Sequence, residues 1–487
     1  MALRLSLLTV LFAVANGMSC NGTDECIDRK TTNNTIAPVS KHGWTKQPLE
    51  RGSLDIIWSC ALTLFLCSWS TICLQIPGEE DSGIEIFWRR AWLTITTLVA
   101  PEVSFCAALN QFIWAQRCVE EFRKSGFDEW TLTHAYFADQ GGFVLHTSDY
   151  PPVPLDGRQL HYLVVQGYVP LPNISAKAIM DRNKKDSILR LITQLQTFWF
   201  LGNVAFRVHE GLHLASLELT TVAFVTCSAT SAIFWWHKPT DVTLADVIYC
   251  DTPMVTIVAN AQGHNPDGFY RYSPLEFISY QEWAWSKIWS HWINILRHLG
   301  LNLIPSVPGG RRQNTNLYPT TTTELVFMFG VSAAYVSIFL LFWNHDFPTR
   351  IELYLWRFAS LDTVVLLCLA VLIDKIGFDL WPGWRDRLMA CDRYRRFRMQ
   401  LDWHPKGSTG RRLWDGMDRV KRACRNNTVS RHPSLDVPLK VNLPMYLIGF
   451  LYVLARAIIT VLDILELRLM PESAYKQPRL MSIFPHF

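Results

Sequence analysis

Three acidic residues in apolar surroundings are the strongest candidates for chemistry in this sequence. Glu218 lies near the start of one apolar run, Asp362 lies near the middle of another, and Glu102 lies inside a third. A charge within a membrane-spanning helix costs several kcal/mol unless it is paired or hydrated, so each acid is a candidate functional residue. A carboxylic acid kept protonated by desolvation can donate a proton to an apolar substrate. The alternative is that Arg357 or Arg456 pairs with an acid and holds helices together.

A second candidate is the run from His209 to His213, which matches the pattern HExxH. On one helix this spacing places two imidazoles on the same face, with a carboxylate beside them to activate zinc-bound water. Gly211 weakens a helix where ligand geometry needs rigidity. The sequence also shows no third ligand, because Glu218 is offset from His213 by roughly 140° around a helix axis. We therefore expect no metal site and no cofactor.

Apolar runs that could hold these residues are long enough to cross a membrane. About 20 helical residues span the ~30 Å hydrocarbon core. Five runs qualify, at residues 56–76, 214–236, 325–343, 353–372 and 443–464. Two more are doubtful, because residues 91–114 are interrupted by Pro101 and residues 187–206 contain Arg190 and two glutamines. The fold class we expect is an α-helical integral membrane protein with about six transmembrane helices and sizeable mixed polar loops.

The charge distribution sets the number of crossings. Residues 385–440 contain 15 Lys and Arg against 6 Asp and Glu, so the positive-inside rule predicts that they are cytoplasmic. If the chain starts in the lumen, an odd number of crossings must precede this cytoplasmic segment. Four of the five clear spans precede it, so one doubtful segment must cross and the other must not. We favour residues 91–114, which makes residues 118–207 luminal. The alternative, with 187–206 crossing, makes most of that region cytoplasmic. Both choices give six crossings.

The N-terminal residues indicate the secretory pathway. Residues 1–17 have one early basic residue, an apolar run and small residues at the end, the layout of a signal peptide. Cys20 and Cys26 follow and could form a disulfide in an oxidising lumen. Asn21, Asn33 and, in the favoured topology, Asn173 are expected N-glycosylation sites. We expect a multi-pass protein of the endoplasmic reticulum or another secretory-pathway membrane.

The remaining organisation follows from these boundaries. We expect a luminal glycosylated segment (18–53), a first transmembrane pair (54–117), a polar region with a doubtful membrane segment (118–213), a transmembrane helix (214–236), a cytoplasmic loop (237–322), a transmembrane hairpin (323–373), a basic cytoplasmic loop (374–440), and a last transmembrane helix with a luminal tail (441–487). No polar region shows a convincing core of its own. Residues 285–299 form an amphipathic helix with tryptophans on its apolar face, placed either in the headgroup region or against the spans. The basic loop can contact anionic lipid headgroups.

Several local motifs together resemble those of a large family of proteins. They are Arg51-Gly52-Ser53 opening a span, Trp130 to Ala135 before Gly141-Gly142-Phe143, Leu217-Glu218, Trp235-Trp236-His237-Lys238-Pro239, and the terminal Phe484-Pro485-His486-Phe487. The combination resembles a group of fungal polytopic membrane proteins of unassigned function. In that group the position of His213 is commonly proline, which argues against a zinc site built on HExxH. The resemblance leaves Glu218 and the Trp-Trp-His-Lys-Pro motif as shared elements; an aromatic belt with a positive flank also explains that motif.

Composition and the buried acids together define the functions we expect. Only 18% of residues are charged and the net charge is +4, so nucleic acid is not an expected partner. The first expectation is a membrane-embedded enzyme of fungal secondary metabolism. It acts on a small hydrophobic terpenoid or polyketide-like intermediate by acid-assisted cyclisation or isomerisation, beside partner enzymes of its pathway. The alternatives are a membrane scaffold or interaction protein, and a transporter of a small hydrophobic metabolite.

Overall fold

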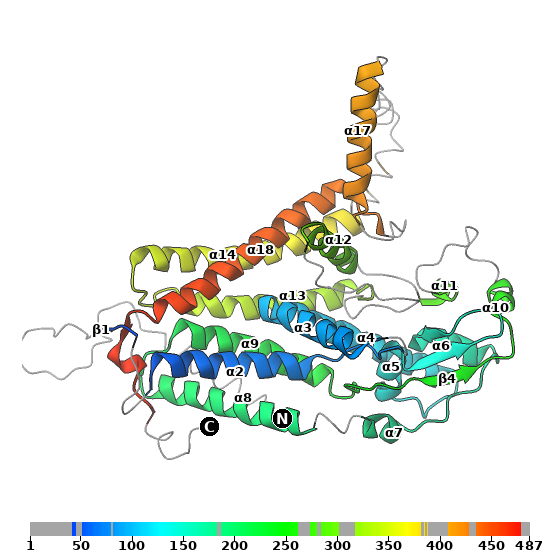
Figure 1. The fold of residues 1–487 in the computed structure, drawn as a ribbon, viewed down its shortest axis with the longest axis horizontal. Coiled ribbons are helices and arrows are strands. Elements are labelled where there is room, and N and C mark those ends of the chain that lie inside the picture. Colours follow the sequence, from blue (N-terminus) through cyan, green and yellow to red (C-terminus); the bar gives the residue numbers. More distant parts are fainter. Residues whose placement is uncertain are drawn as a thin grey trace, which may run out of the picture.

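The computed structural model describes residues 41–44, 51–78, 81–182, 187–261, 273–279, 284–300, 317–380, 384, 387, 408–427 and 435–478. Within these residues the protein is mainly helical. Long helices lie side by side in a bundle, and a small α/β subdomain lies at one end of it (Figure 1). Cys20, Cys26, Asn21 and Asn33 fall outside the described residues.

Six helical segments run along the bundle. They are α2 (Ser53–Thr71), α8 (Ser187–His209), α9 (Ser216–Phe234), α13 (Thr322–Ser337) continued by the 3₁₀ helix η1 (Ile338–Phe342), α14 (Arg350–Asp374) and α18 (Leu439–Glu466). Helix α9 lies in the middle, and its side chains Leu219, Ala223 and Phe224 are almost completely buried. Residues of α2, α8, η1, α14 and α18 pack around it in one apolar core. Helices α14 and α18 cross on the outside of the bundle (Figure 1).

Four of these segments are long and apolar enough to cross a membrane. They are Ser53–Thr71, Ser216–Phe234, Thr322–Phe342 and Leu439–Glu466, and a fifth span results if one bent helix pair is counted. The helices expected at 56–76, 214–236, 325–343 and 443–464 are thus confirmed. The segment expected at 353–372 is one continuous helix, α14, but α14 is not one of the four.

The bent pair consists of α3 (Gly83–Val99) and α4 (Pro101–Lys124), whose axes turn by 112° at Ala100. Pro101 suits the first turn of α4 because it needs no backbone donor there. The tip of the pair reaches α18, where Arg456 Nε donates to the Val99 carbonyl at 3.2 Å. Near the start of the pair, Arg89 pairs with Asp81, and Arg90 in the middle of α3 donates to the Trp69 carbonyl near the end of α2. Because the far end of α4 packs into the subdomain core, both ends of this hairpin lie at the subdomain end of the bundle.

The α/β subdomain combines residues 125–181 with residues 237–261 and 273–279. Its elements are α5 (Leu132–Asp139), β2 (Phe143–His146), β3 (Val153–Leu155), α6 (Gly157–Val165), α7 (Ala176–Asp181), β4 (Asp246–Tyr249), α10 (Met254–Asn260) and α11 (Glu276–Ser279). The sheet order is β3-β2-β4, with β2 antiparallel to β3 and parallel to β4. Phe137, Phe143 and Leu160 are fully buried in its core. Two polar regions about 100 residues apart build this core together, which neither region showed in its own sequence.

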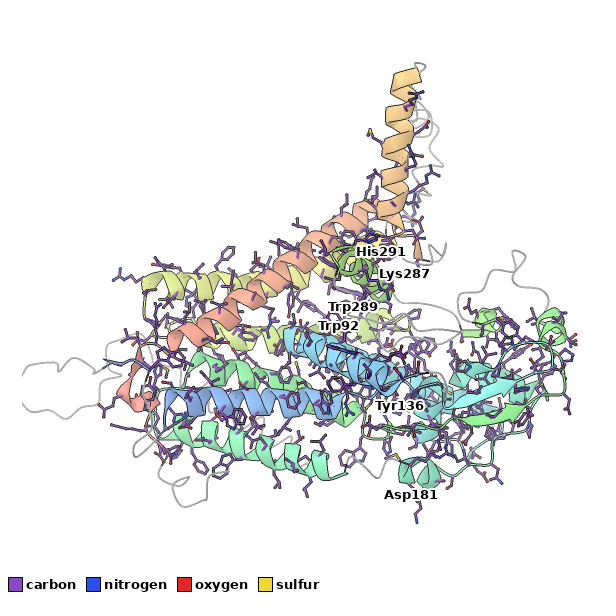
Figure 2. The ribbon with its side chains drawn as sticks, viewed as in Figure 1. Trp92, Tyr136, Asp181, Lys287, Trp289 and His291 are labelled. Atoms are coloured by element: carbon purple, nitrogen blue, oxygen red, sulfur yellow. The ribbon has the colours of Figure 1, made fainter. Side chains whose placement is uncertain are left out.

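Two further helices lie near the start of α18. Helix α12 (Ala284–His298) packs Trp285, Ile288 and Trp292 against α14 and α18, so the amphipathic helix expected at 285–299 covers the bundle with its apolar face. His291 on this helix is completely buried (Figure 2). Helix α17 (Ser408–Arg425) instead projects away from the bundle, across the direction of its helices (Figure 1). At the opposite end of the bundle, β1 (Lys41–His42) pairs with β5 (Met470–Pro471), and the 3₁₀ helix η4 (Glu472–Ala474) follows.

Candidate functional site

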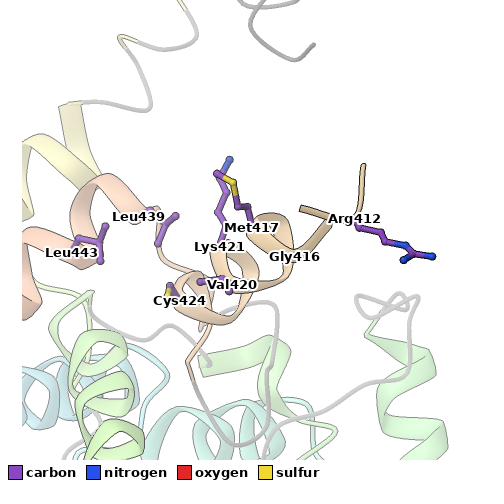
Figure 3. Close-up of a pocket in the computed structure, with 8 residues that line it drawn as sticks. All are labelled: Arg412, Gly416, Met417, Val420, Lys421, Cys424, Leu439 and Leu443. Atoms are coloured by element: carbon purple, nitrogen blue, oxygen red, sulfur yellow. The ribbon is translucent and has the colours of Figure 1, made fainter. Parts of the chain in front are cut away.

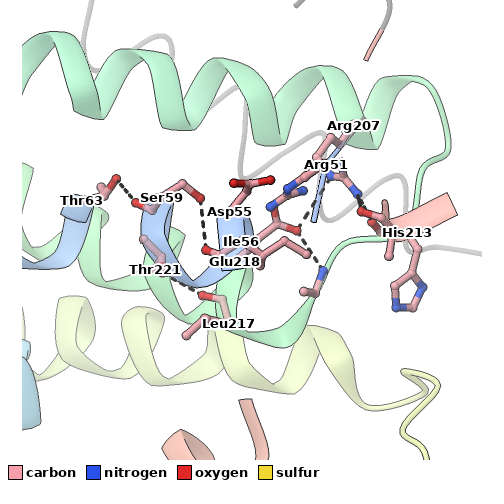
Figure 4. Close-up of polar contacts among 12 residues, drawn as sticks. Arg51, Asp55, Ile56, Ser59, Thr63, Arg207, His213, Leu217, Glu218 and Thr221 are labelled. Carbon is pink, nitrogen blue, oxygen red and sulfur yellow. Dashed lines mark hydrogen bonds and ion pairs between the residues drawn. The ribbon is translucent and has the colours of Figure 1, made fainter. Parts of the chain in front are cut away.

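Glu218 lies in a buried ion cluster at the end of the bundle opposite the subdomain (Figure 4). Its carboxylate accepts a hydrogen bond from Arg51 Nη2, and the other carboxylate oxygen lies 3.8 Å from Arg207 Nε. The Ala215 amide also donates to it, at 3.0 Å. Glu218 and Arg207 have side-chain exposures of 2% and 0%. A carboxylate compensated by two guanidinium groups has the arrangement of a structural ion pair rather than of a proton donor.

Arg207 connects three segments at this end of the bundle. It donates to the carbonyl oxygens of His213 at 2.6 Å, Ala474 at 2.8 Å and Lys476 at 2.8 Å. The end of α8, the loop before α9 and the chain after α18 are therefore fixed to one another. This explains why an arginine is tolerated inside the apolar core: its guanidinium group is satisfied by three carbonyl groups as well as by Glu218.

A second group of ligand-type side chains lies beside this ion cluster. His213, His345 and Glu466 each offer one ligand atom, and these atoms all lie within 4.8 Å of one another. His345 Nε2 is 2.6 Å from Glu466 Oε1, and His213 Nε2 is 3.5 Å from the same oxygen. The Ser216 amide donates to the other oxygen, Oε2, at 2.8 Å. Sequence reasoning missed His345 and Glu466, which come from a loop and from the last turn of α18.

The HExxH spacing does not place its two imidazoles on one helix. Helix α8 ends at His209, and Gly211 adopts a left-handed backbone with φ of +67°. Only glycine adopts this conformation without strain, so it ends the helix before His213 is reached. His209 and Glu210 are exposed, whereas His213 turns toward His345.

Glu102 lies at the tip of the α3–α4 hairpin, inside the bundle. Its side chain is buried, and its Oε1 atom is hydrogen-bonded to the hydroxyl of Tyr452 on α18. The other oxygen, Oε2, has no hydrogen-bond partner among the described residues. Arg456 lies one turn further along α18, with its guanidinium 5.0 Å from the ring centroid of Phe339. Its Nε atom donates to the Val99 carbonyl at the tip of the hairpin. An acid, a phenol and a cation thus meet at the tip of a hairpin that ends within the bundle.

Asp362 lies apart from the other two acids. It is half-buried on α14, and the described residues provide it with no hydrogen bond or ion pair. Its neighbours Leu361 and Val365 are 48% and 44% exposed, so this part of α14 faces outward. Glu218, Glu102 and Asp362 share no partner, and the structure does not bring them together as one catalytic site.

Among the described residues, no direct ion pair joins Arg357 or Arg456 to an acid, although the charge of Arg456 acts on Glu102 and Asp463. Arg357 donates to the Trp343 carbonyl at 2.7 Å, and Arg456 donates to the Val99 carbonyl. Asp463 accepts a hydrogen bond from Thr220 at 2.9 Å. The hydrogen bonds of Glu102 and Asp463 thus come from Tyr452 and Thr220, with Arg456 acting on both acids through its charge.

The Trp-Trp-His-Lys-Pro motif connects α9 to the subdomain. Lys238 is 4% exposed, and its Nζ atom donates to Gln111 Oε1 at 2.7 Å. Trp235 Nε1 donates to the same oxygen at 3.0 Å. Burial lowers the pKa of Lys238. The lysine is consequently a buried packing element and does not supply a positive flank facing lipid headgroups.

A pocket lies away from all of these acids, at the base of α17 (Figure 3). It has a volume of about 700 Å³ and lies between α17 and the first turns of α18. Its lining residues are Arg412, Gly416, Met417, Val420, Lys421, Cys424, Leu439 and Leu443. No acidic side chain lines it, so it is not a cavity that serves Glu102, Glu218 or Asp362.

Part of the chain matches a known protein family. A family described as a family of unknown function (DUF8562) matches residues 29–260. This range includes Arg51, Glu102, Arg207 and Glu218, and it ends before the second half of the bundle. No curated protein matches the chain, and no solved structure matches it.

Proposed function

We propose that this chain is a multi-pass protein of a secretory-pathway membrane with six crossings. The crossings are α2, α8, α9, α13 with η1, α14 and α18, and the α3–α4 pair is a re-entrant hairpin. This assignment replaces our preference for residues 91–114 as a crossing, because both ends of that hairpin lie at the subdomain end. Its consequence is that residues 125–181 lie on the cytoplasmic side.

The side chains of α8 support a position in lipid. Leu191, Leu195 and Phe198 are 56%, 62% and 43% exposed. On the inner face, Gln196 donates to Thr63 on α2 at 3.2 Å. Gln194 is exposed, but most of the exposed large side chains of α8 are apolar, and such a face suits hydrocarbon better than water.

The position of α17 supports the same orientation. This helix lies at the subdomain end and carries basic residues together with exposed Met417 and Val420. A helix that runs across the direction of the spans and has one basic and one apolar face fits the surface of an anionic leaflet. The positive-inside rule then assigns the subdomain end to the cytoplasm and the Glu218 end to the lumen.

Glycosylation tests the topology. We expect that the double variant Asn21→Gln, Asn33→Gln carries no N-glycan, because Asn173 lies on the cytoplasmic side. The measurement is the gel mobility of the full chain before and after endoglycosidase treatment. A glycan that persists in the double variant and disappears when Asn173→Gln is added would refute the topology and restore residues 91–114 as a crossing.

For the activity, we propose a membrane-embedded enzyme that acts on a small apolar intermediate by acid-assisted isomerisation or cyclisation, with Glu102 as the proton donor. The observation that carries this proposal is the buried Glu102 carboxyl at the tip of the hairpin, bonded to Tyr452 on one oxygen and without a partner on the other. Glu218 is compensated by two arginines, whereas Glu102 Oε2 is buried and has no hydrogen-bond partner among the described residues. A phenol bonded to a carboxyl can also return the proton after the reaction.

Product analysis tests the activity. The full chain is expressed with its chromosomal neighbours, and the apolar metabolites are compared by mass spectrometry. We expect Glu102→Gln to abolish the product and Tyr452→Phe to reduce it, because the glutamine keeps the shape of the side chain but carries no acidic proton. Asp362→Asn is the matched control, since Asp362 lies outside the hairpin, and it should leave the product unchanged. An unchanged product profile with stably folded Glu102→Gln would refute the enzyme proposal and favour a scaffold.

A further inference from the structure

We propose that His213, His345 and Glu466 bind one divalent transition-metal ion, with zinc the best match to the ligand set. The site lies at the Glu218 end of the bundle. It goes beyond the proposed function, because Glu102 and its proton chemistry do not depend on it.

The three side chains converge from segments far apart in the sequence. His213 lies in the loop between α8 and α9, His345 lies between η1 and α14, and Glu466 ends α18. Their side-chain exposures are 16%, 7% and 0%. Two imidazoles and one carboxylate are the three protein ligands of a common class of zinc site, and a fourth position stays open for water or another ligand. The ligand atoms, all within 4.8 Å of one another, are close enough to surround a single ion after small side-chain adjustments.

The hydrogen bonds among His213, His345 and Glu466 do not satisfy all of their nitrogen and oxygen atoms. Both Nε2 atoms face the same carboxylate oxygen, Glu466 Oε1, and the imidazole rings stack with centroids 4.7 Å apart. His213 Nε2 has no hydrogen-bond partner in the part of the chain that the structure describes. Two stacked imidazoles that were both protonated would repel each other. One divalent cation uses both nitrogens and the oxygen at once.

The surroundings hold the ligands in the required positions. The Ser216 amide fixes the second oxygen of Glu466, which leaves Oε1 directed toward the histidines. Arg207 fixes the backbone of His213 through its carbonyl group. The ring of Phe342 stacks on His345 with centroids 4.2 Å apart. Such outer contacts orient metal ligands and set their affinity.

The charges nearby permit a cation. The guanidinium groups of Arg51 and Arg207 are compensated by Glu218, and Arg468, two residues after Glu466, pairs with Glu352. Asp463 lies one helical turn before Glu466 on α18 and accepts a hydrogen bond from Thr220. Because the ligand set requires His213, we expect the site only in chains that have histidine at this position.

Metal analysis of the full chain tests the site. The protein is purified in detergent, exposed to zinc chloride alone, dialysed and analysed by mass spectrometry of the metal. We expect about one zinc ion per chain, since three protein ligands bind one ion. We expect this zinc to be lost in His345→Ala and in Glu466→Gln. His209→Ala is the matched control and should keep its zinc, because His209 belongs to the HExxH pattern but not to this site.

The outcomes separate the two arrangements that share His213. Zinc lost in His209→Ala but kept in His345→Ala would overturn the proposal in favour of HExxH, and a wild-type chain without zinc would overturn it outright. If His345→Ala does not fold, cobalt substitution of the wild-type chain decides. Strong visible absorption from a four-coordinate cobalt ion supports the site, and its absence overturns the site. Neither measurement depends on product formation, so failure here is distinct from failure of the enzyme proposal.

Discussion

Replacing Glu218 by glutamine tests the structural role of the ion cluster most directly. The substitution keeps the size of the side chain and removes its charge. Arg51 and Arg207, with side-chain exposures of 7% and 0%, then lose their counter-charge. Removing one partner of a buried ion pair costs ~3–5 kcal/mol, since the remaining charge stays desolvated.

The hydrogen bonds of Arg207 refine this magnitude. Arg207 retains three carbonyl acceptors in Glu218→Gln, so the penalty falls mainly on Arg51. We therefore expect the lower end of the range, about 3 kcal/mol. Arg207→Met removes the cation and leaves three carbonyl groups without their donor, each worth ~1–3 kcal/mol when buried. It should destabilise the protein more than Glu218→Gln does.

Thermal unfolding of the full chain in detergent measures both effects. At ~2–4 °C per kcal/mol, a loss of about 3 kcal/mol in Glu218→Gln should lower the midpoint by roughly 6–12 °C. The control Asp346→Asn changes an exposed acid at the same end of the bundle and should leave the midpoint unchanged. If Glu218→Gln melts with the wild type, the cluster does not stabilise the fold. If it also loses the product at unchanged stability, Glu218 is a proton donor after all.

Three further predictions concern the subdomain and α12. A Cβ atom at Gly142 would lie 2.5 Å from the ring of Phe137, so Gly142→Ala should destabilise the subdomain by ~1–3 kcal/mol and speed its cleavage in limited proteolysis; unchanged cleavage would contradict this packing. Tyr136 donates to the Phe234 carbonyl at 2.9 Å, and Tyr136→Phe should cost about 1 kcal/mol in denaturant unfolding, whereas a gain in stability would show that this bond is not formed. Burial lowers the pKa of His291 below its ordinary value of 6.5, so the unfolded chain binds the proton more readily and stability should fall as the pH drops below 6.5. His291→Asn should flatten this part of the stability curve, and an equal slope in both proteins would exclude His291 as its origin.

The sequence predicted the helices of the bundle where an apolar run was long and nearly free of charge. Runs of this kind identify α9, α13 and α18 without knowledge of their neighbours, because hydrocarbon or a helical core requires apolar side chains on all faces. The prediction was weaker for α8. Gln196 and Thr197 face α2, whereas Gln194 is exposed, and mean hydropathy does not distinguish inward-facing polar groups from exposed ones.

The hairpin and the subdomain depended on tertiary contacts that no local pattern encodes. Pro101 predicted a break in the segment 91–114, but the direction of the following helix is set by the contact of Val99 and Glu102 with α18. The subdomain sheet pairs Phe143 with Asp246, two residues about 100 positions apart. The short strands carry too few residues for a period of two to be visible in either segment alone.

The expected topology alone predicts part of the candidate metal site. The expected topology of six crossings, whichever doubtful segment crosses, predicts that the loops containing His213 and His345 and the end of the last span lie on the luminal side. It thus predicts that these three side chains lie at one end of the bundle. What it did not contain was the reason for their contact, which is the fixing of the α8–α9 loop to the chain after α18 through Arg207. A buried arginine that bonds to carbonyl groups on both segments brings them together, and the ion cluster that first appeared as a catalytic candidate is thus the element that positions the neighbouring ligands.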